Sequence, residues 1–288
     1  MAQDKDTVKA GWYVALLVDV LGQHEAIRNA PPLPRTEEDR VSYLGAMRES
    51  AGKAEQVRKL VSAFFGRYLD VTSPAILNKL NTEQRAQYDI LSECPIHIQM
   101  FSDTVIAFAP LCTSGRVSTR GVIAMIWAAV STLVHSLSDE IAVRGAIDVD
   151  EAIELHENEL YGRVVLNVHH LEKNVAQWPR IVVGKGLLEF LTQMQKMPCS
   201  DVVDQMNSKV AQKCLSIIEP DVDGVPIIDY LGRGVRCEFG SSALAQETLE
   251  RSFAFVRREH KRFAQSGDRK LALRYGLLRH YYERKTAE

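Results

Sequence analysis

Two aspartates in this sequence stand where acidic side chains are able to hold a divalent cation. Asp19 follows a continuous apolar run, 12–18, and Asp103 lies in a two-residue turn between two strand-like runs. If the first strand and the hairpin are neighbours in one sheet, both carboxylates lie at one edge and repel each other unless a cation lies between them. Two Mg²⁺ or Mn²⁺ ions fit such oxygen ligands and usually bind substrate phosphates as well. The pair therefore predicts metal-assisted phosphoryl chemistry, in which one ion activates a hydroxyl and the other neutralises the leaving group.

Each aspartate also has a plainer interpretation, because Asp is a common cap of turns. For one aspartate alone, that interpretation is the better one. The two together, each at the end of a strand-like run, favour the metal pair.

The elements that must position these residues follow from hydrophobic periodicity. A buried first strand is followed by a helical stretch, a hairpin, an apolar helix, a strand, a second helix and a last strand. This order predicts an α/β (α+β) fold, a ferredoxin-like or palm-type sandwich with an antiparallel sheet in residues 1–185. Residues 186–288 are expected to form a mainly helical extension packed on this core as one structural unit. After the first strand, the predicted elements are 36–69, 96–101, 104–108, 121–137, 141–149, 162–176 and 180–183.

Composition narrows the function classes. The formal net charge of −2 gives no field that draws the chain to nucleic acid or membrane. The apolar stretch 122–137 is short for a membrane span and is expected to be a buried helix. Five widely spaced cysteines without a CxxC indicate reduced thiols in a cytoplasmic protein. The phosphate loop of P-loop proteins, the G-x-S-x-G elbow and the H-E-x-x-H zinc motif are all absent.

Several short motifs resemble those of class III nucleotidyl cyclases over roughly residues 12–185. Val18–Gly22 resembles the segment that opens these domains, and Phe101–Asp103 resembles their second metal-binding turn. The likeness is closer to the Pycsar pyrimidine cyclases of bacterial anti-phage defence. The shared motifs are Asp19–Gly22, Phe101–Thr104, Arg144-Gly145, Leu171-Glu172, Pro179–Ile181, Asp223-Gly224 and Asp229–Leu231.

The resemblance implies an activity, ions and partners. The enzyme would be a cytoplasmic homodimer that converts UTP, or CTP, to the 3′,5′-cyclic nucleotide and pyrophosphate. It would hold two Mn²⁺ or Mg²⁺ ions with Asp19, Val20 and Asp103, and Val20 would also border the nucleotide. A separate cyclic-nucleotide effector would read the product.

Two residues are candidates for reading the base. The lysine that reads the purine in related cyclases is replaced by Gln99, whose amide both donates and accepts hydrogen bonds. Tyr43, after the Pro-rich loop, is expected to stack on the smaller pyrimidine ring. Equally, Gln99 could satisfy a neighbouring strand, and Tyr43 could be a core residue of an amphipathic helix. The likeness favours UTP over CTP.

The family's transition-state Asn and Arg are not matched, because Leu166 and His170 stand in their places. Another cation must then act on the phosphates, and Arg163, Arg180 and Lys185 are the candidates. Arg180 is the residue we expect in this catalytic role. The alternative is a slow or inactive site.

Other functions remain open at this point. The chain could be a cytidylate or purine nucleotide cyclase. It could also be a non-catalytic palm domain that binds a nucleotide or a partner protein. A diguanylate cyclase is disfavoured because Phe101–Asp103 replaces the Gly-Gly-Asp/Glu-Glu-Phe turn of that group.

Overall fold

The computed structural model describes residues 9–22, 34–69, 80–92, 94–113, 115–156, 159–239 and 242–287. These residues form nine helices and an open, eight-stranded, mostly antiparallel sheet with one parallel pair of strands. The prediction of a mixed α/β fold with an antiparallel sheet and further C-terminal helices is thereby confirmed. A separate two-stranded ribbon consists of β4 (Cys112–Thr113) and β5 (Arg116–Val117).

The large sheet has its most buried strand in the middle. The strand β1 (Lys9–Val20) has antiparallel neighbours on both sides and buries every side chain from Tyr13 to Val18, as its apolar run predicts. Along the sheet the strands are β2 (His97–Phe101), β3 (Thr104–Pro110), β1, β6 (Val143–His156), β8 (Ile181–Val183), β10 (Pro226–Ile228) and β9 (Ile218–Pro220), with β7 (Glu159–Gly162) paired to β6.

The contact between β1 and β6 depends on a glycine. A Cβ atom at Gly145 would lie 2.1 Å from the carbonyl oxygen of Leu17, which is far inside contact distance. Glycine at this position therefore lets β6 approach β1 closely. The neighbouring residue on β6, Arg144, is thereby placed directly opposite Asp19.

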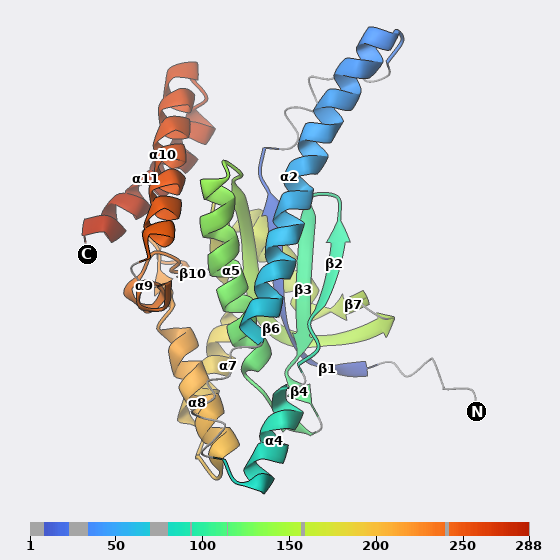
Figure 1. Cartoon of the computed structure of the whole chain (residues 1–288), viewed down its shortest axis with the longest axis vertical. Helices are drawn as coiled ribbons and strands as arrows, with labels where there is room; N and C mark the ends of the chain where they lie inside the picture. Colours follow the sequence, from blue (N-terminus) through green and yellow to red (C-terminus); the bar gives the residue numbers. More distant parts are fainter. Residues whose placement is uncertain are drawn as a thin grey trace.

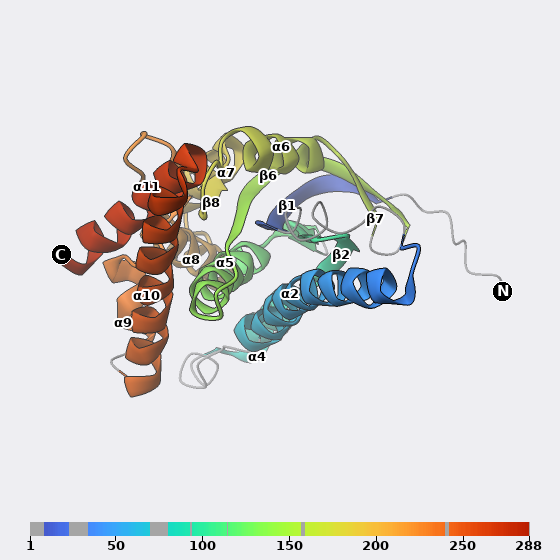
Figure 2. The ribbon, with the colours of Figure 1, turned by 90° about the horizontal axis from the view of Figure 1, so that it is seen from above.

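Helices cover both faces of the sheet. In Figure 2, α2 (Glu37–Leu69) and α5 (Arg120–Ser138) lie below the sheet, and α6 (Arg163–Asn174) and α7 (Lys185–Lys196) lie above it. The helix α5 is the one described helix with the length and apolar composition of a membrane span. Of its most apolar 18-residue stretch, 89% is buried inside the molecule. This confirms that the apolar stretch 122–137 is a buried helix.

The chain after residue 185 is helical, as predicted, but it also extends the sheet. The hairpin of β9 and β10 encloses a turn at 221–224 and joins the sheet through β8. Its strands have three residues each, too few for an alternating pattern to reveal them. The strand β7, with four residues, is also too short to show such a pattern. The helices not yet named are α4 (Thr82–Ser92), α8 (Val202–Leu215), α9 (Arg233–Phe239), α10 (Ala243–Ser266) and α11 (Arg269–Ala287).

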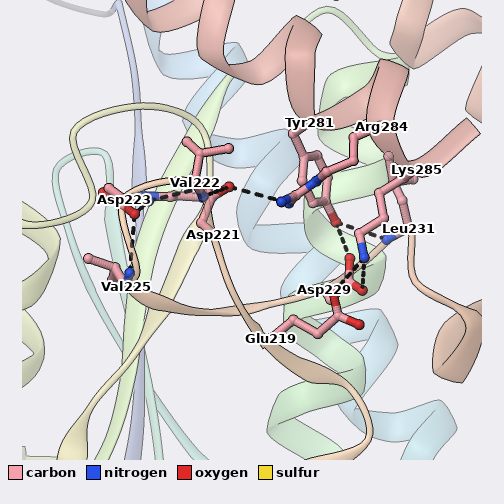
Figure 3. A network of polar contacts seen from close by, with 11 residues as sticks. Glu219, Asp221, Val222, Asp223, Val225, Asp229, Leu231, Tyr281, Arg284 and Lys285 are labelled. Atoms are coloured by element: carbon pink, nitrogen blue, oxygen red, sulfur yellow. Dashed lines mark hydrogen bonds and ion pairs between the residues drawn. The ribbon is translucent and has the colours of Figure 1, made fainter. Parts of the chain in front are cut away.

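The last helix, α11, is joined to the hairpin of β9 and β10 by a network of charges around the buried Lys285 and Asp229 (Figure 3). The ammonium group of Lys285 lies 2.6 Å from a carboxylate oxygen of Glu219 and 2.8 Å from one of Asp229. The hydroxyl of Tyr281 donates to the other oxygen of Asp229 at 2.6 Å. Burial raises the pKa of the Asp229 carboxyl, although the hydrogen bonds from Lys285 and Tyr281 lower it. These contacts fix α11 against the edge of the sheet that β9 and β10 form.

Candidate functional site

Asp19 and Asp103 lie at the same end of the sheet. Asp19 is the penultimate residue of β1 and pairs with Thr104, which directly follows Asp103 in the turn between β2 and β3. The backbone N–H of Val20 donates to the carbonyl oxygen of Asp103 at 3.3 Å. The arrangement of the two aspartates that the sequence predicts is therefore present, whereas their binding of metal stays a prediction.

A hydrogen bond from α2 stabilises the turn that carries Asp103. Ser102 has a φ of 54°, in the left-handed region, as a two-residue hairpin turn requires. The guanidinium of Arg58, on α2, donates to the carbonyl oxygen of Ser102 at 2.6 Å. The Asp103 side chain is half-buried and makes no hydrogen bond or ion pair within the described part of the chain. Its carboxylate is therefore available to a ligand.

Asp19 belongs to a chain of charges across the sheet. The hydroxyl of Thr104 donates to one of its oxygens at 3.0 Å, and a guanidinium nitrogen of Arg144 lies 3.6 Å from the other. Arg144 also forms an ion pair at 2.6 Å with Glu172, a buried residue of α6. Burial raises the pKa of the Glu172 carboxyl; Arg144 lowers it and the negative charge of Asp19 adds to the rise. Arg144 thus partly neutralises two carboxylates.

The sequence includes these partners of Asp19 in the family motifs, but it gives them no role at the site. Thr104, Arg144 and Glu172 each belong to a motif of the family resemblance, but nothing in their spacing showed that they meet. They come from β3, β6 and α6, and only the pairing of β1 with both neighbouring strands brings them together.

Gln99 lies on the same face of the sheet as Asp19. It pairs with Ile106, which pairs with Leu17, and Leu17 is two residues from Asp19 along β1. Gln99 and Ile106 are half-buried, while Phe101 on the same face is 83% exposed. In Figure 2, α6 lies over β1 and β6, and no described helix covers this face at β2. A ligand at Asp19 would have room to extend toward Gln99.

Tyr43 and Val20 do not occupy the positions expected of them as side chains. Tyr43 precedes Arg58, which contacts the turn, by fifteen residues on one continuous helix. At 1.5 Å per residue it is about 22 Å away, where α2 projects beyond the sheet (Figure 1). The structure therefore does not bring Tyr43 close to the turn with Asp103 in its own chain, and its stacking on a base stays a prediction. The Val20 side chain is 3% exposed, so only its backbone is able to contribute to the predicted metal site.

Arg180 is held by other partners. Its guanidinium is 2% exposed, lies over the ring of Trp178 and donates to the carboxylates of Asp221 and Asp223 at 2.8–3.0 Å. It also donates to the carbonyl oxygen of Val175 at 2.8 Å. These two carboxylates and the enclosure of the guanidinium leave it no exposed face for a phosphate. The structure therefore does not bring Arg180 to Asp19 as a catalytic group.

The remaining cation candidates are also engaged. Arg163 lies 3.6 Å from Glu151, and Lys185 lies 3.1 Å from Glu189. Leu166 is 71% exposed and His170 is exposed, while the face of α6 that meets the sheet is made by other residues of the helix. The side chains that stand in the places of the family's Asn and Arg thus point away from Asp19 in this chain.

The two carboxylates suit a metal ion whose remaining ligands come from the substrate. Asp19 and Asp103 supply two hard oxygen donors, but no group of three or more His, Cys, Asp or Glu side chains among the described residues is arranged to hold an ion. Mg²⁺ commonly binds through one or two carboxylates and is completed by water and substrate phosphates. The donor set therefore fits a Mg²⁺ or Mn²⁺ ion bound together with a phosphate ligand. Comparison with protein-family models, curated proteins and solved structures finds no significant match to this chain.

Proposed function

We propose that this chain is a metal-dependent nucleotidyl cyclase of the class III type that converts UTP to 3′,5′-cyclic UMP and pyrophosphate. The observation that supports it best is the position of Asp19 and Asp103 at one end of neighbouring strands. The strand order β2-β3-β1-β6, with helices after β1 and β3, is that of a ferredoxin-like, palm-type core, which supports the same assignment. The further proposal that the product serves as a second messenger in anti-phage defence is based on the family resemblance alone.

The proposed reaction is an intramolecular displacement. The ribose 3′-oxygen attacks the α-phosphorus, a new P–O bond forms, and the bond between the α-phosphorus and the bridging oxygen breaks. Pyrophosphate leaves with that oxygen, and the hydroxyl proton passes to solvent. Two bound Mg²⁺ or Mn²⁺ ions would acidify the hydroxyl and neutralise the leaving pyrophosphate.

The residues of the chain prepare this geometry. The hydrogen bond from Thr104 and the ion pair with Arg144 orient the Asp19 carboxylate. Arg58 fixes the turn that carries Asp103. Gln99 lies on the same face and would contact the base edge.

A second candidate is a palm domain that binds a nucleotide without converting it. Leu166 and His170 favour this alternative, because the leucine side chain forms no hydrogen bonds and a histidine stabilises a phosphate only weakly. Incubating the protein with each of the four nucleoside triphosphates and Mn²⁺ distinguishes the two. Cyclic product with equimolar pyrophosphate supports the cyclase, and binding without product supports the alternative.

We expect UTP to be preferred over CTP, and both to be preferred strongly over ATP and GTP. A site that hydrogen-bonds the base leaves polar groups unpaired when the wrong base enters, at about 1–3 kcal/mol for each lost bond. Replacing Gln99 with Ala should therefore reduce the preference for pyrimidine over purine triphosphates by roughly 5- to 150-fold. Competition assays with all four triphosphates measure it, and dominant cyclisation of ATP or GTP would contradict the pyrimidine assignment.

We also expect a homodimer, with Phe101 at or near its interface. A phenylalanine that is 83% exposed beside the open face of β2 is unfavourable in water and would be covered by a second copy. Replacing Phe101 with Asp should weaken association at least 10-fold in sedimentation equilibrium. A fully active monomer at assay concentration would contradict this prediction.

A further inference from the structure

The face of α6 that meets the sheet carries a carboxylate in a row of apolar residues. Val164, Val168 and Glu172 follow one another at intervals of four residues, and all three are buried. At the position of Glu172, which is 5% exposed, an apolar side chain would pack without the cost of burying a charge. Buried carboxylates are almost always paired, and the partner of this one is Arg144. An acid at this point of the helix therefore needs a reason other than packing.

Arg144 lies between two carboxylates, but its two contacts are unequal. Its Nε lies 2.6 Å from Glu172, whereas one Nη lies 3.6 Å from Asp19. The attraction between opposite charges falls with distance, so the contact with Glu172 is the stronger one. His169 lies 4.0 Å from the other Glu172 oxygen but is exposed, which makes it a weaker partner. Because Asp19 and Glu172 share one guanidinium, the group keeps a net negative charge that attracts a cation.

Removing the charge of Glu172 would change the contact between Arg144 and Asp19. Asp19 would then be the carboxylate left to Arg144 among the residues that the structure describes. A gap of 3.6 Å closes to a charge-assisted hydrogen bond with a small movement of the side chain. A guanidinium bound closely to Asp19 occupies an oxygen that a metal needs and opposes the positive charge of the ion.

We propose that Glu172 is a positioning residue that draws the Arg144 guanidinium away from Asp19 and keeps this carboxylate open to a divalent cation. The inference rests on the proposed function for the metal at Asp19. At the longer distance, Arg144 orients Asp19 without fully neutralising it. Glu172 sets that distance from α6, across the strand pair of β1 and β6.

Calorimetric titration with Mn²⁺ tests this proposal, both without nucleotide and with 3′-deoxy-UTP, which lacks the attacking hydroxyl. Replacing Glu172 with Gln should weaken Mn²⁺ binding about 10- to 100-fold, because the ion must then displace a charge-assisted hydrogen bond between Arg144 and Asp19. Replacing Glu172 with Asp should give an intermediate affinity, because the charge remains on a shorter side chain. The control, Glu189→Gln, removes an exposed carboxylate from α7 and should leave the affinity unchanged.

A second substitution separates this role from a purely structural one. In Glu172→Gln, Arg144 is the group that blocks Asp19, so replacing Arg144 with Met as well should restore most of the Mn²⁺ affinity. The double variant buries no unpaired charge, and Asp19 keeps its hydrogen bond from Thr104. If Glu172 only held α6 on the sheet, the second substitution would restore nothing.

Three results would overturn the proposal. The first is wild-type Mn²⁺ affinity in Glu172→Gln or, if that variant does not fold, in Glu172→Asp. The second is a double variant that binds Mn²⁺ no better than Glu172→Gln. The third is a wild type that binds no Mn²⁺ in either titration.

The outcomes for this inference and for the cyclase are distinct. If UTP is cyclised and Glu172→Gln binds Mn²⁺ normally, the role of Glu172 is wrong and the cyclase stands. If Glu172→Gln loses Mn²⁺ affinity, the double variant recovers it and no triphosphate gives a cyclic product, the role of Glu172 stands and the cyclase is wrong.

Discussion

Replacing Asp19 with Asn should reduce cyclase activity by a factor on the order of 10³ or more while leaving the fold intact. A metal ion contributes several kcal/mol of transition-state stabilisation, and each 1.4 kcal/mol is about tenfold in rate. The amide keeps an oxygen that can accept the hydrogen bond from Thr104 but lacks the charge that a divalent ion requires. Arg144 keeps its ion pair with Glu172, so the free energy of unfolding should change by about 1 kcal/mol or less.

Asp103→Asn should have the same effect on activity, since its carboxylate has no other partner in the described chain. The measurements are cyclic UMP production with Mn²⁺ and urea unfolding of each variant. Asp89→Asn is the matched control, because Asp89 is an exposed aspartate on α4 that pairs with Arg85. Near-normal turnover in either Asp19→Asn or Asp103→Asn would show that the metal assignment is wrong.

Replacing Lys285 with Met should reduce the free energy of unfolding by about 3–5 kcal/mol. The lysine side chain is only 2% exposed and lies between Glu219 and Asp229. Methionine fills much of the same volume but leaves the Asp229 carboxylate buried, with the Tyr281 hydroxyl as its one remaining side-chain donor among the residues that the structure describes. Urea unfolding at pH 7 measures the loss. A change below 1 kcal/mol would contradict the buried network shown in Figure 3.

The deficit of Lys285→Met should shrink as the pH falls from neutral toward about 4. In the wild type, the hydrogen bond from Lys285 lowers the pKa of Glu219, so this contribution is lost only below the ordinary carboxyl pKa, as the pH falls through the lowered folded value. In the variant, burial without the lysine raises the folded pKa of Asp229 further, and its protonated form is better tolerated at low pH. Both effects bring the two proteins closer together in acid.

Two further variants test the origin of this effect. Combining Lys285→Met with Asp229→Asn should recover part of the lost stability, because no unpaired charge is then buried. Lys270→Met removes an exposed lysine from the same helix and should change stability by no more than about 0.5 kcal/mol. If the double variant is as unstable as Lys285→Met alone, lost packing rather than the buried carboxylate is the cause.

Local patterns in the sequence determined most of the elements that form the core. The apolar run before Asp19, the two strands around Ser102 and Asp103, and the long helices each have enough residues to show their period. Because a two-residue turn sets the register of a hairpin, the sequence also predicts Asp103 at the tip of its hairpin. The pairing of β1 with β3 is what brings Asp19 beside it.

The tertiary structure alone decided which charges meet. The sequence indicates a catalytic role for Arg180 and nothing particular for Lys285. Both are buried, and their partners are acids of β9, of the turn between β9 and β10, and of the residue that follows β10. Tyr43 looked close to the nucleotide, but one unbroken helix carries it away. The physical reason is that periodicity reports the face on which a side chain lies, whereas ion pairs depend on the packing of segments far apart in the chain.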